Sequence, residues 1–242
     1  AWSKDDGSPV TRADAEIEQE LRRQVERFRP GDGFVGEEVG ASDGESGRRW
    51  IVDGISGTLF YVAGEPTWVT LIALHEPSGV SVGIVPSPAL GRRWWAERGH
   101  GAYTGSILDG ELADVRRIAV SESRDPSPGR TAVLPYAADL DGPQAELLAL
   151  LGGGLPSNKP WCHQLQVAEG LLDLAVWFTG GPWDLAALSL IVEEAGGHFF
   201  DLSGGRSIDR ESGVFSNHAM HDQLLAGIAL HRFGERGTQH DP

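Results

Sequence analysis

Residues 50–62, "WIVDGISGTLFYV", run from an apolar segment through a glycine-rich turn into a second apolar segment. Three apolar residues precede Asp53, and the turn at residues 54–57 leads to Thr58. A strand that enters such a turn and continues as a helix is a common way to build a phosphate or metal site, because amides at a helix start favour an anion. The stretch therefore predicts a strand, a turn and a helix, with Asp53 pointing into the crevice beyond a sheet.

Composition limits the classes of protein to which this chain can belong. Its 242 residues, 40% hydrophobic and 23% charged, suffice for one large domain or two small ones. A formal net charge of −15 argues against nucleic-acid binding, which needs a basic face. An anionic substrate would then need local positive charge, which a metal ion can supply. The single cysteine, Cys162, excludes an intramolecular disulfide and favours a cytoplasmic location, and no apolar run is long enough to span a membrane.

Periodicity predicts a helix followed by a strand-rich first half. Apolar residues recur at helical spacing over residues 13–28. The glycine-rich segment that carries Glu37 and Glu38 is expected to be a loop. Apolar segments bounded by turn residues predict strands at residues 50–53, 68–76, 80–89, 115–121 and 131–135, and a strand pair around residues 99–101.

The second half alternates predicted helices with buried strands. Helices are expected at residues 142–154, from residue 160, at residues 184–195 and near residues 221–233. Strands are expected at residues 172–178, 198–201 and 213–217. Because strand-rich and helix-rich stretches come in blocks, the chain is predicted to form a layered α/β or α+β fold.

Acidic residues lie at the ends of these elements, and most have an ordinary explanation when taken alone. Asp14 is typical of a first helical turn. Glu37 and Glu38 are typical of a solvated loop, and Asp184, which opens an apolar helix, is typical of an N-cap. Taken together they also suit Mg²⁺, which prefers oxygen ligands and keeps several waters, so carboxylates from separate loops can bind it.

The order of the motifs is more specific than any one of them. "SPVTRAD" is followed by "GEE", "WIVDGISGT", "SVGIVPSPALGRRWWAERGHGAY", "VAEG" and "PWDLAALSLIVEEAGG". In this order they resemble the inositol monophosphatase family, and within it most closely the histidinol-phosphate phosphatases, over residues 4–230. The resemblance implies a layered αβαβα sandwich, a single unit over residues 1–242 with approximate lobes at 1–130 and 131–242. The family also begins with a helix for which this sequence offers no counterpart.

The resemblance also implies a function and roles for individual residues. It implies a phosphoric monoester hydrolase that acts on a small molecule with Mg²⁺, two or more ions in the family, and that forms a homodimer. Glu37 would serve catalysis as well as metal binding, Thr58 and Asp14 would position the nucleophilic water, and the amides of Gly57 and Thr58 would bind the phosphate. The metal ligands would be Glu37, Asp53, the backbone carbonyl of Ile55, and Asp184.

One position of the metal motif departs from the family. The family has Asp-Pro-Ile-Asp-Gly-Thr, whereas residues 53–58 are Asp-Gly-Ile-Ser-Gly-Thr. Ser56 thus replaces an acid, which removes a negative charge and shortens the reach of the side chain. The expected cost exceeds the roughly 10–100-fold loss seen when a group that only orients a metal ligand is removed. Metal binding is therefore predicted to be weaker or to involve fewer ions, and the change at Gly54 favours natural drift or repurposing over an engineered knock-out.

Further departures fall where the family binds its substrate. Trp177 stands in place of an acid, and residues 158–161, Asn-Lys-Pro-Trp, replace a segment that contains glycine. Trp161 and Trp177 either pack in the core or line an aromatic pocket that would disfavour a polyol. His163 is either a plain helix residue or, as a side chain that titrates near neutral pH, part of that pocket together with Ser56.

The predicted function is Mg²⁺-dependent hydrolysis of a small-molecule phosphate monoester, weakened or altered at Ser56. Two alternatives stay open on the sequence: an enzyme of small-molecule metabolism that no longer hydrolyses phosphate esters, and a non-catalytic binding protein on the same fold. The phosphatase is favoured by the retained Glu37, Asp53, Thr58 and Asp184. The alternatives are favoured by Ser56, Trp177 and residues 158–161. No nucleic-acid or membrane partner is expected.

Overall fold

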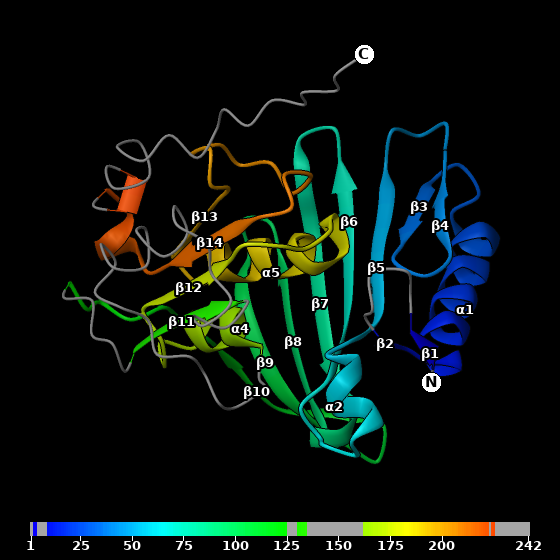
Figure 1. Ribbon diagram of the computed structural model, residues 1–242, viewed down its shortest axis with the longest axis horizontal. Helices are drawn as coiled ribbons and strands as arrows, with labels where there is room; N and C mark the ends of the chain where they lie inside the picture. Colours follow the sequence, from blue (N-terminus) through cyan, green and yellow to red (C-terminus); the bar gives the residue numbers. More distant parts are fainter. Residues whose placement is uncertain (1, 4–8, 125–129, 135–161, 223, 226–242) are drawn as a thin grey trace.

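The computed structural model describes residues 2–3, 9–124, 130–134, 162–222 and 224–225 (Figure 1). The predicted helix at residues 142–154, Trp161, and most of the predicted helix near residues 221–233 lie outside these ranges. No helix among the described residues is long and apolar enough to cross a membrane.

The larger sheet has eight strands in the order β10-β9-β8-β7-β6-β5-β3-β4. All neighbours are antiparallel except β3 and β5, which are parallel. The strands predicted at residues 50–53, 68–76 and 80–89 and the strand pair around residues 99–101 are confirmed within it, whereas the strand predicted at residues 131–135 corresponds to Thr131–Leu134 of the smaller sheet. Its strands are β3 (Gly33–Gly36), β4 (Gly40–Ser42), β5 (Arg49–Ser56), β6 (Val69–Glu76), β7 (Gly79–Ser87), β8 (Arg92–Glu97), β9 (Gly101–Leu108) and β10 (Glu111–Arg117).

The smaller sheet has four strands in the order β11-β12-β14-β13. Its first pair is parallel and the other pairs are antiparallel. The strands are β11 (Thr131–Leu134), β12 (Leu174–Trp177), β13 (His198–Phe200) and β14 (Gly213–Ser216), and a separate short pair joins β1 (Trp2–Ser3) to β2 (Pro9–Val10).

Helices separate the sheets and cover the larger one. Helix α5 (Pro182–Glu194) lies between the two sheets, and residues 185–192 are all buried, which explains why its sequence is apolar on every side (Figure 1). Helix α1 (Arg12–Phe28) packs beside β5 on the other face of the larger sheet. The remaining helices are α2 (Thr58–Val62), α4 (His163–Ala168), and two short 3₁₀ turns, η1 (Pro88–Leu90) and η4 (His218–Met220).

The alternation of side chains along the strands explains the two covered faces. Ile51 and Leu71 belong to the core that also contains the apolar side chains of α5. Val52 and Ile72, the next residue on each strand, instead line a groove beside α1. Successive strand residues point to opposite faces, so the same two strands contact helices on both sides.

Two sequence-based boundaries were wrong. The segment around Glu37 was expected to be a loop, but residues 33–36 form β3, because Phe34 is buried and this segment pairs in parallel with β5. Strand β10 spans Glu111–Arg117, whereas a strand at residues 115–121 was predicted, because its pairing with β9 runs through a register shift after Ala113 and stops at Arg117. In both cases pairing with a neighbouring strand decided the structure, and local composition did not.

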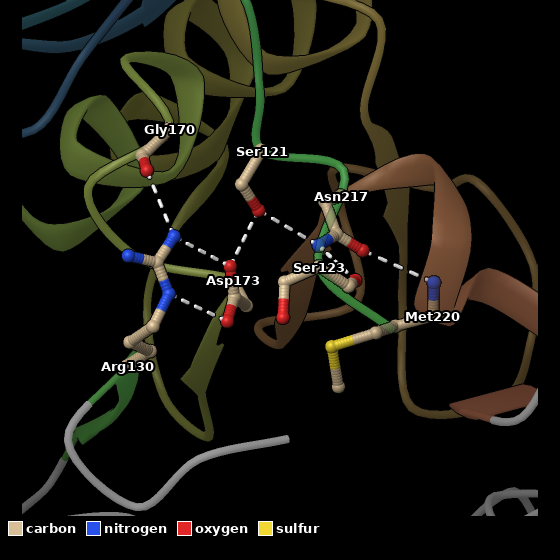
Figure 2. Close-up of polar contacts among 7 residues, drawn as sticks. All are labelled: Ser121, Ser123, Arg130, Gly170, Asp173, Asn217 and Met220. Atoms are coloured by element: carbon tan, nitrogen blue, oxygen red, sulfur yellow. Dashed lines mark hydrogen bonds and ion pairs between the residues drawn. The ribbon is translucent and has the colours of Figure 1, made fainter. Parts of the chain in front are cut away.

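An ion pair between the partly exposed Arg130 and the buried Asp173 ties the smaller sheet together (Figure 2). Arg130 donates from Nε to Asp173 Oδ2 over 2.7 Å and from Nη2 to Oδ1 over 2.8 Å. The hydroxyl of Ser121 also donates to Asp173 Oδ1, and Asn217 Nδ2 donates to Ser121 Oγ over 2.9 Å. Arg130 precedes β11, Asp173 precedes β12, and Asn217 follows β14. The network therefore joins the ends of three strands.

Candidate active site

Asp53 lies at the centre of the site, on β5, with 2% of its surface exposed. Burial raises the pKa of its carboxyl well above the ordinary value, and the negative charges of Glu37 and Asp184 raise it further. The three carboxylates predicted to bind metal are therefore close enough to interact electrostatically. Segments far apart in the sequence have brought together acids that repel one another.

A β-bulge places Asp53 and Ser56. These two residues of β5 pair with Leu71 and Val69 of β6, so a three-residue step on one strand opposes a two-residue step on the other. Bulges of this kind redirect side chains and are common beside active sites. The Ser56 hydroxyl donates a hydrogen bond to Asp53, which lowers the pKa of that carboxyl against the larger effect of burial. Ser56 therefore contacts the site as a hydrogen-bond donor to the neighbouring acid.

Glu37 and Asp184 come to Asp53 from two different elements of the fold. Glu37 follows β3, and its N–H donates to the carbonyl of Val52 over 3.3 Å. Asp184 stands in the first turn of α5, and its Oδ2 accepts from the N–H of Gly181, the N-cap, over 2.8 Å. Asp184 was expected to be the N-cap of this helix. It is instead a residue of the first turn that accepts the N–H of the N-cap, so it still stabilises the start of the helix.

Asp14 and Thr58 make other hydrogen bonds. Asp14 Oδ2 accepts from the N–H of Thr11 over 2.8 Å and from its hydroxyl over 2.5 Å, which forms a capping box at the start of α1. Thr58 Oγ1 donates to the carbonyl of Ile55 over 3.0 Å. Asp14 nevertheless lies against the turn, because a Cβ added to Gly54 would come within 2.6 Å of its carbonyl oxygen. Their role in positioning a water is still a prediction.

Gly57 adopts the left-handed conformation, with φ at 88°, and forms the N-cap of α2. A residue with a side chain would be strained there, since only glycine enters this region without cost. Thr58 is then the first residue of the helix. The strand–turn–helix unit expected from residues 50–62 is confirmed, and the amides predicted to bind phosphate lie at the turn.

Trp177 lies beside Asp184. A Cβ added to Gly180 would come within 2.9 Å of the indole Nε1 and within 3.1 Å of Asp184 Oδ2, so both groups border one position. Trp177 is half-buried at the end of β12. His163 is buried on α4, and Trp161 lies outside the described residues. Trp177 thus lies beside a predicted metal ligand, and the aromatic pocket is still a prediction.

The sequence did not single out two further residues near the acids. Burial raises the pKa of the Cys162 thiol to about 12, and the charges of Asp184 and Asp53 contribute, so this N-cap of α4 faces the site. Glu18 of α1 is fully buried; burial raises the pKa of its carboxyl against hydrogen bonds from Glu38, Val39 and Gly54. Glu18 is an ordinary position within α1, and Cys162 is the N-cap of α4. No sequence motif marks either residue as part of a site.

The donor set fits a hard divalent cation. Burial and the negative charges of Glu37 and Asp184 raise the pKa of Asp53, and a cation bound beside these carboxylates would relieve that repulsion. Among the described residues, no group of three or more His, Cys, Asp or Glu side chains stands close enough to hold a metal ion. Mg²⁺ bound by one or two of these carboxylates and several waters matches such an open arrangement.

The match to known proteins agrees with this geometry. Residues 3–231 match the model of the inositol monophosphatase family, and the chain belongs to that family. It is 38% identical over 243 residues to a histidinol-phosphatase of Mycobacterium tuberculosis, covering 93% of this chain and 86% of that protein. It is also 38% identical over 237 residues to a histidinol-phosphatase of Streptomyces coelicolor, covering 92% of this chain and 85% of that protein.

Solved structures confirm the fold class. The extragenic suppressor protein suhB of Bartonella henselae superimposes with a TM-score of 0.75 at 27% identity, covering 96% of this chain and 87% of that chain. The αβαβα sandwich predicted from the motifs is therefore confirmed.

Proposed function

We propose that this protein hydrolyses the phosphate monoester of a small molecule with the help of Mg²⁺. The observation that carries the proposal is the buried carboxyl of Asp53, which stands near enough to Glu37 and Asp184 for their negative charges to add to burial in raising its pKa. A fold alone does not define a reaction, but a perturbed acid cluster in a family of phosphatases does suggest one. When bound, Mg²⁺ would neutralise charge on the phosphate and activate water.

The residues of the chain have distinct parts in this proposal. Glu37, Asp53 and Asp184 would hold the cation, and Ser56 would orient Asp53 through its hydrogen bond. The amides of Gly57 and Thr58 would bind phosphate oxygens at the turn that the left-handed glycine creates. Most of the acceleration would come from positioning and charge neutralisation, as is usual for phosphoryl transfer.

The substrate proposed for the first test is histidinol phosphate. The support is the 38% identity to two histidinol-phosphatases over more than nine-tenths of this chain. Trp177 beside Asp184 also favours a substrate with a flat, weakly polar group over a polyol, because an indole stacks on such groups.

A phosphate-release assay tests the proposal. The panel contains histidinol phosphate, inositol 1-phosphate and p-nitrophenyl phosphate, each with Mg²⁺ and with EDTA. We expect Mg²⁺-dependent release that is fastest with histidinol phosphate. The function is wrong if neither the natural protein nor its Ser56→Asp variant releases phosphate from any ester, and the substrate alone is wrong if another ester is preferred.

Two finer expectations belong to this proposal: a homodimer, which the family resemblance implies, and a cytoplasmic location, which the single cysteine favours. Light scattering tests the first, with a mass near twice that of the 25.9 kDa chain as the expected result. A monomer at working concentration would contradict it.

A further inference from the structure

Glu18 joins the two segments that carry Glu37 and Asp53. Its Oε2 accepts from the N–H of Glu38 over 2.9 Å and from that of Val39 over 3.0 Å. Its Oε1 accepts from the N–H of Gly54 over 3.2 Å. One side chain of α1 therefore bonds to backbone directly after each of two proposed metal ligands.

The surrounding glycines leave space for this carboxylate and for little else. A Cβ added to Gly36 would come within 2.4 Å of Glu18 Oε2. A Cβ added to Gly54 would come within 2.6 Å of the Asp14 carbonyl on α1. The helix thus approaches both segments closely, and any larger residue at position 36 would displace the carboxylate.

Gly54 also supplies a backbone N–H that the family motif lacks at this position. The family motif has proline at this position, and proline has no N–H to donate. The bond from Gly54 to Glu18 Oε1 is therefore possible here and impossible with proline. Charge-assisted bonds of this kind are roughly twice as strong as neutral ones.

Arg22, one helical turn after Glu18, holds the same loop by its carbonyl groups. Its Nη2 donates to Val39 O over 3.1 Å and to Gly40 O over 2.7 Å. Residues four apart on a helix lie on one face. Glu18 binds the amides and Arg22 the carbonyls of the turn that follows Glu37, so α1 restrains that turn by both kinds of backbone group.

We propose that Glu18 is a positioning residue that fixes the separation of Glu37 and Asp53, and that Gly54 lets it do so in this chain. The expected effect on metal binding rests on the proposed function. The positioning of the two segments by Glu18 does not depend on the reaction. A buried carboxylate is costly to retain, and here it acts through the two segments that it bonds.

Amide hydrogen exchange of the metal-free protein tests the positioning directly. In Glu18→Gln the amide oxygen can replace only part of the carboxylate, and the new NH₂ group faces an N–H donor. We expect exchange of the Glu38, Val39 or Gly54 amide to accelerate by about 10-fold or more, the loss of one hydrogen bond to a charged group. Glu16→Gln, an exposed glutamate on the same helix, is the matched control and should change nothing.

Magnesium binding measured by calorimetry tests the consequence. Removing a group that orients metal ligands lowers metal affinity by about 10–100-fold, and we expect this for Glu18→Gln. Raised Mg²⁺ should restore its phosphate release with little change in KM for the ester, which a general loss of structure would not do. Glu18→Asp keeps the charge and serves as a second variant if Glu18→Gln does not fold; its shorter side chain should weaken Mg²⁺ binding in the same direction.

The outcomes separate this inference from the proposed function. Unchanged exchange at all three amides, with folding intact, would overturn the positioning role whatever the enzyme does. Faster exchange with unchanged Mg²⁺ affinity would overturn the link to metal binding. If the natural protein neither binds Mg²⁺ nor releases phosphate, the proposed function fails, while the exchange result still decides whether Glu18 holds the two segments.

Discussion

Asp53 and Asp173 are both withdrawn from solvent, with 2% and 0% of their surface exposed, yet their surroundings are opposite. Burial would raise the pKa of Asp173, but hydrogen bonds from Arg130 and Ser121 outweigh it and lower that pKa (Figure 2). Asp53 faces Glu37 and Asp184, and its pKa rises. Asp173 is neutralised by its own chain, whereas the proposed function requires a cation to neutralise the acids around Asp53.

The difference shows how to tell a structural acid from a functional one. Stability favours buried charges that are paired and fully hydrogen-bonded. Sites that break this rule are where function is expected, because repulsion there is a cost that only a ligand relieves.

The largest effect is expected for Asp53→Asn. Loss of the central carboxylate should lower Mg²⁺-dependent phosphate release by more than about 100-fold, beyond the loss seen when only an orienting group is removed. Steady-state kinetics measure it, with the exposed Asp43→Asn as the control. Activity within tenfold of the natural protein would show that Asp53 is not a metal ligand.

Asp173→Asn should act on stability. Breaking a buried pair is strongly destabilising, and because Arg130 is partly exposed we expect about 2 kcal/mol, a fall in Tm of about 4–8 °C. Thermal unfolding measures it. Asp209→Asn, which breaks the exposed pair with Arg49, should cost less than about 1 kcal/mol. Equal effects of the two substitutions would contradict the structural role of Asp173.

Ser56→Asp should increase the repulsion among the acids around Asp53 and leave the paired Asp173 unaffected. It adds a fourth carboxylate, so Mg²⁺ affinity should rise by about 10-fold or more while the metal-free protein loses stability. Calorimetry and thermal unfolding with and without Mg²⁺ measure both, beside Ser78→Asp in an exposed turn as the control. A rise in metal-free stability would mean that the added acid points away from the site.

Lowering the pH should reduce the contribution of Asp173 to the free energy of unfolding. Its folded-state pKa lies below the ordinary value of 3.8, so its contribution is present above that value and is lost as pH falls toward the folded-state pKa. The difference in free energy of unfolding between the natural protein and Asp173→Asn should therefore shrink as pH falls below about 4. Denaturant titrations at pH 7, 4 and 3 measure it, and a difference that grows with acidity would contradict the assigned ion pair.

Local pattern predicted much of the fold because the pattern is strong where the chain is regular. Helix α1, helix α5 and the hairpin of β6 and β7 follow from spacing and turn residues. Strand β3 did not, because four residues around Phe34 become a strand only through pairing with β5. The bulge between Asp53 and Ser56 is likewise a property of two strands together.

The sequence by itself determined which acids were available and in what order, through motifs that also identify the family. Only the tertiary structure decided which of them meet: Glu37, Asp53 and Asp184 are close enough to interact electrostatically, and Asp173 is paired. It also revealed Glu18, whose ordinary helical position hides three bonds to distant amides. The physical reason is that pKa shifts and hydrogen bonds depend on distance and burial, and neither is written in the spacing of residues along a chain.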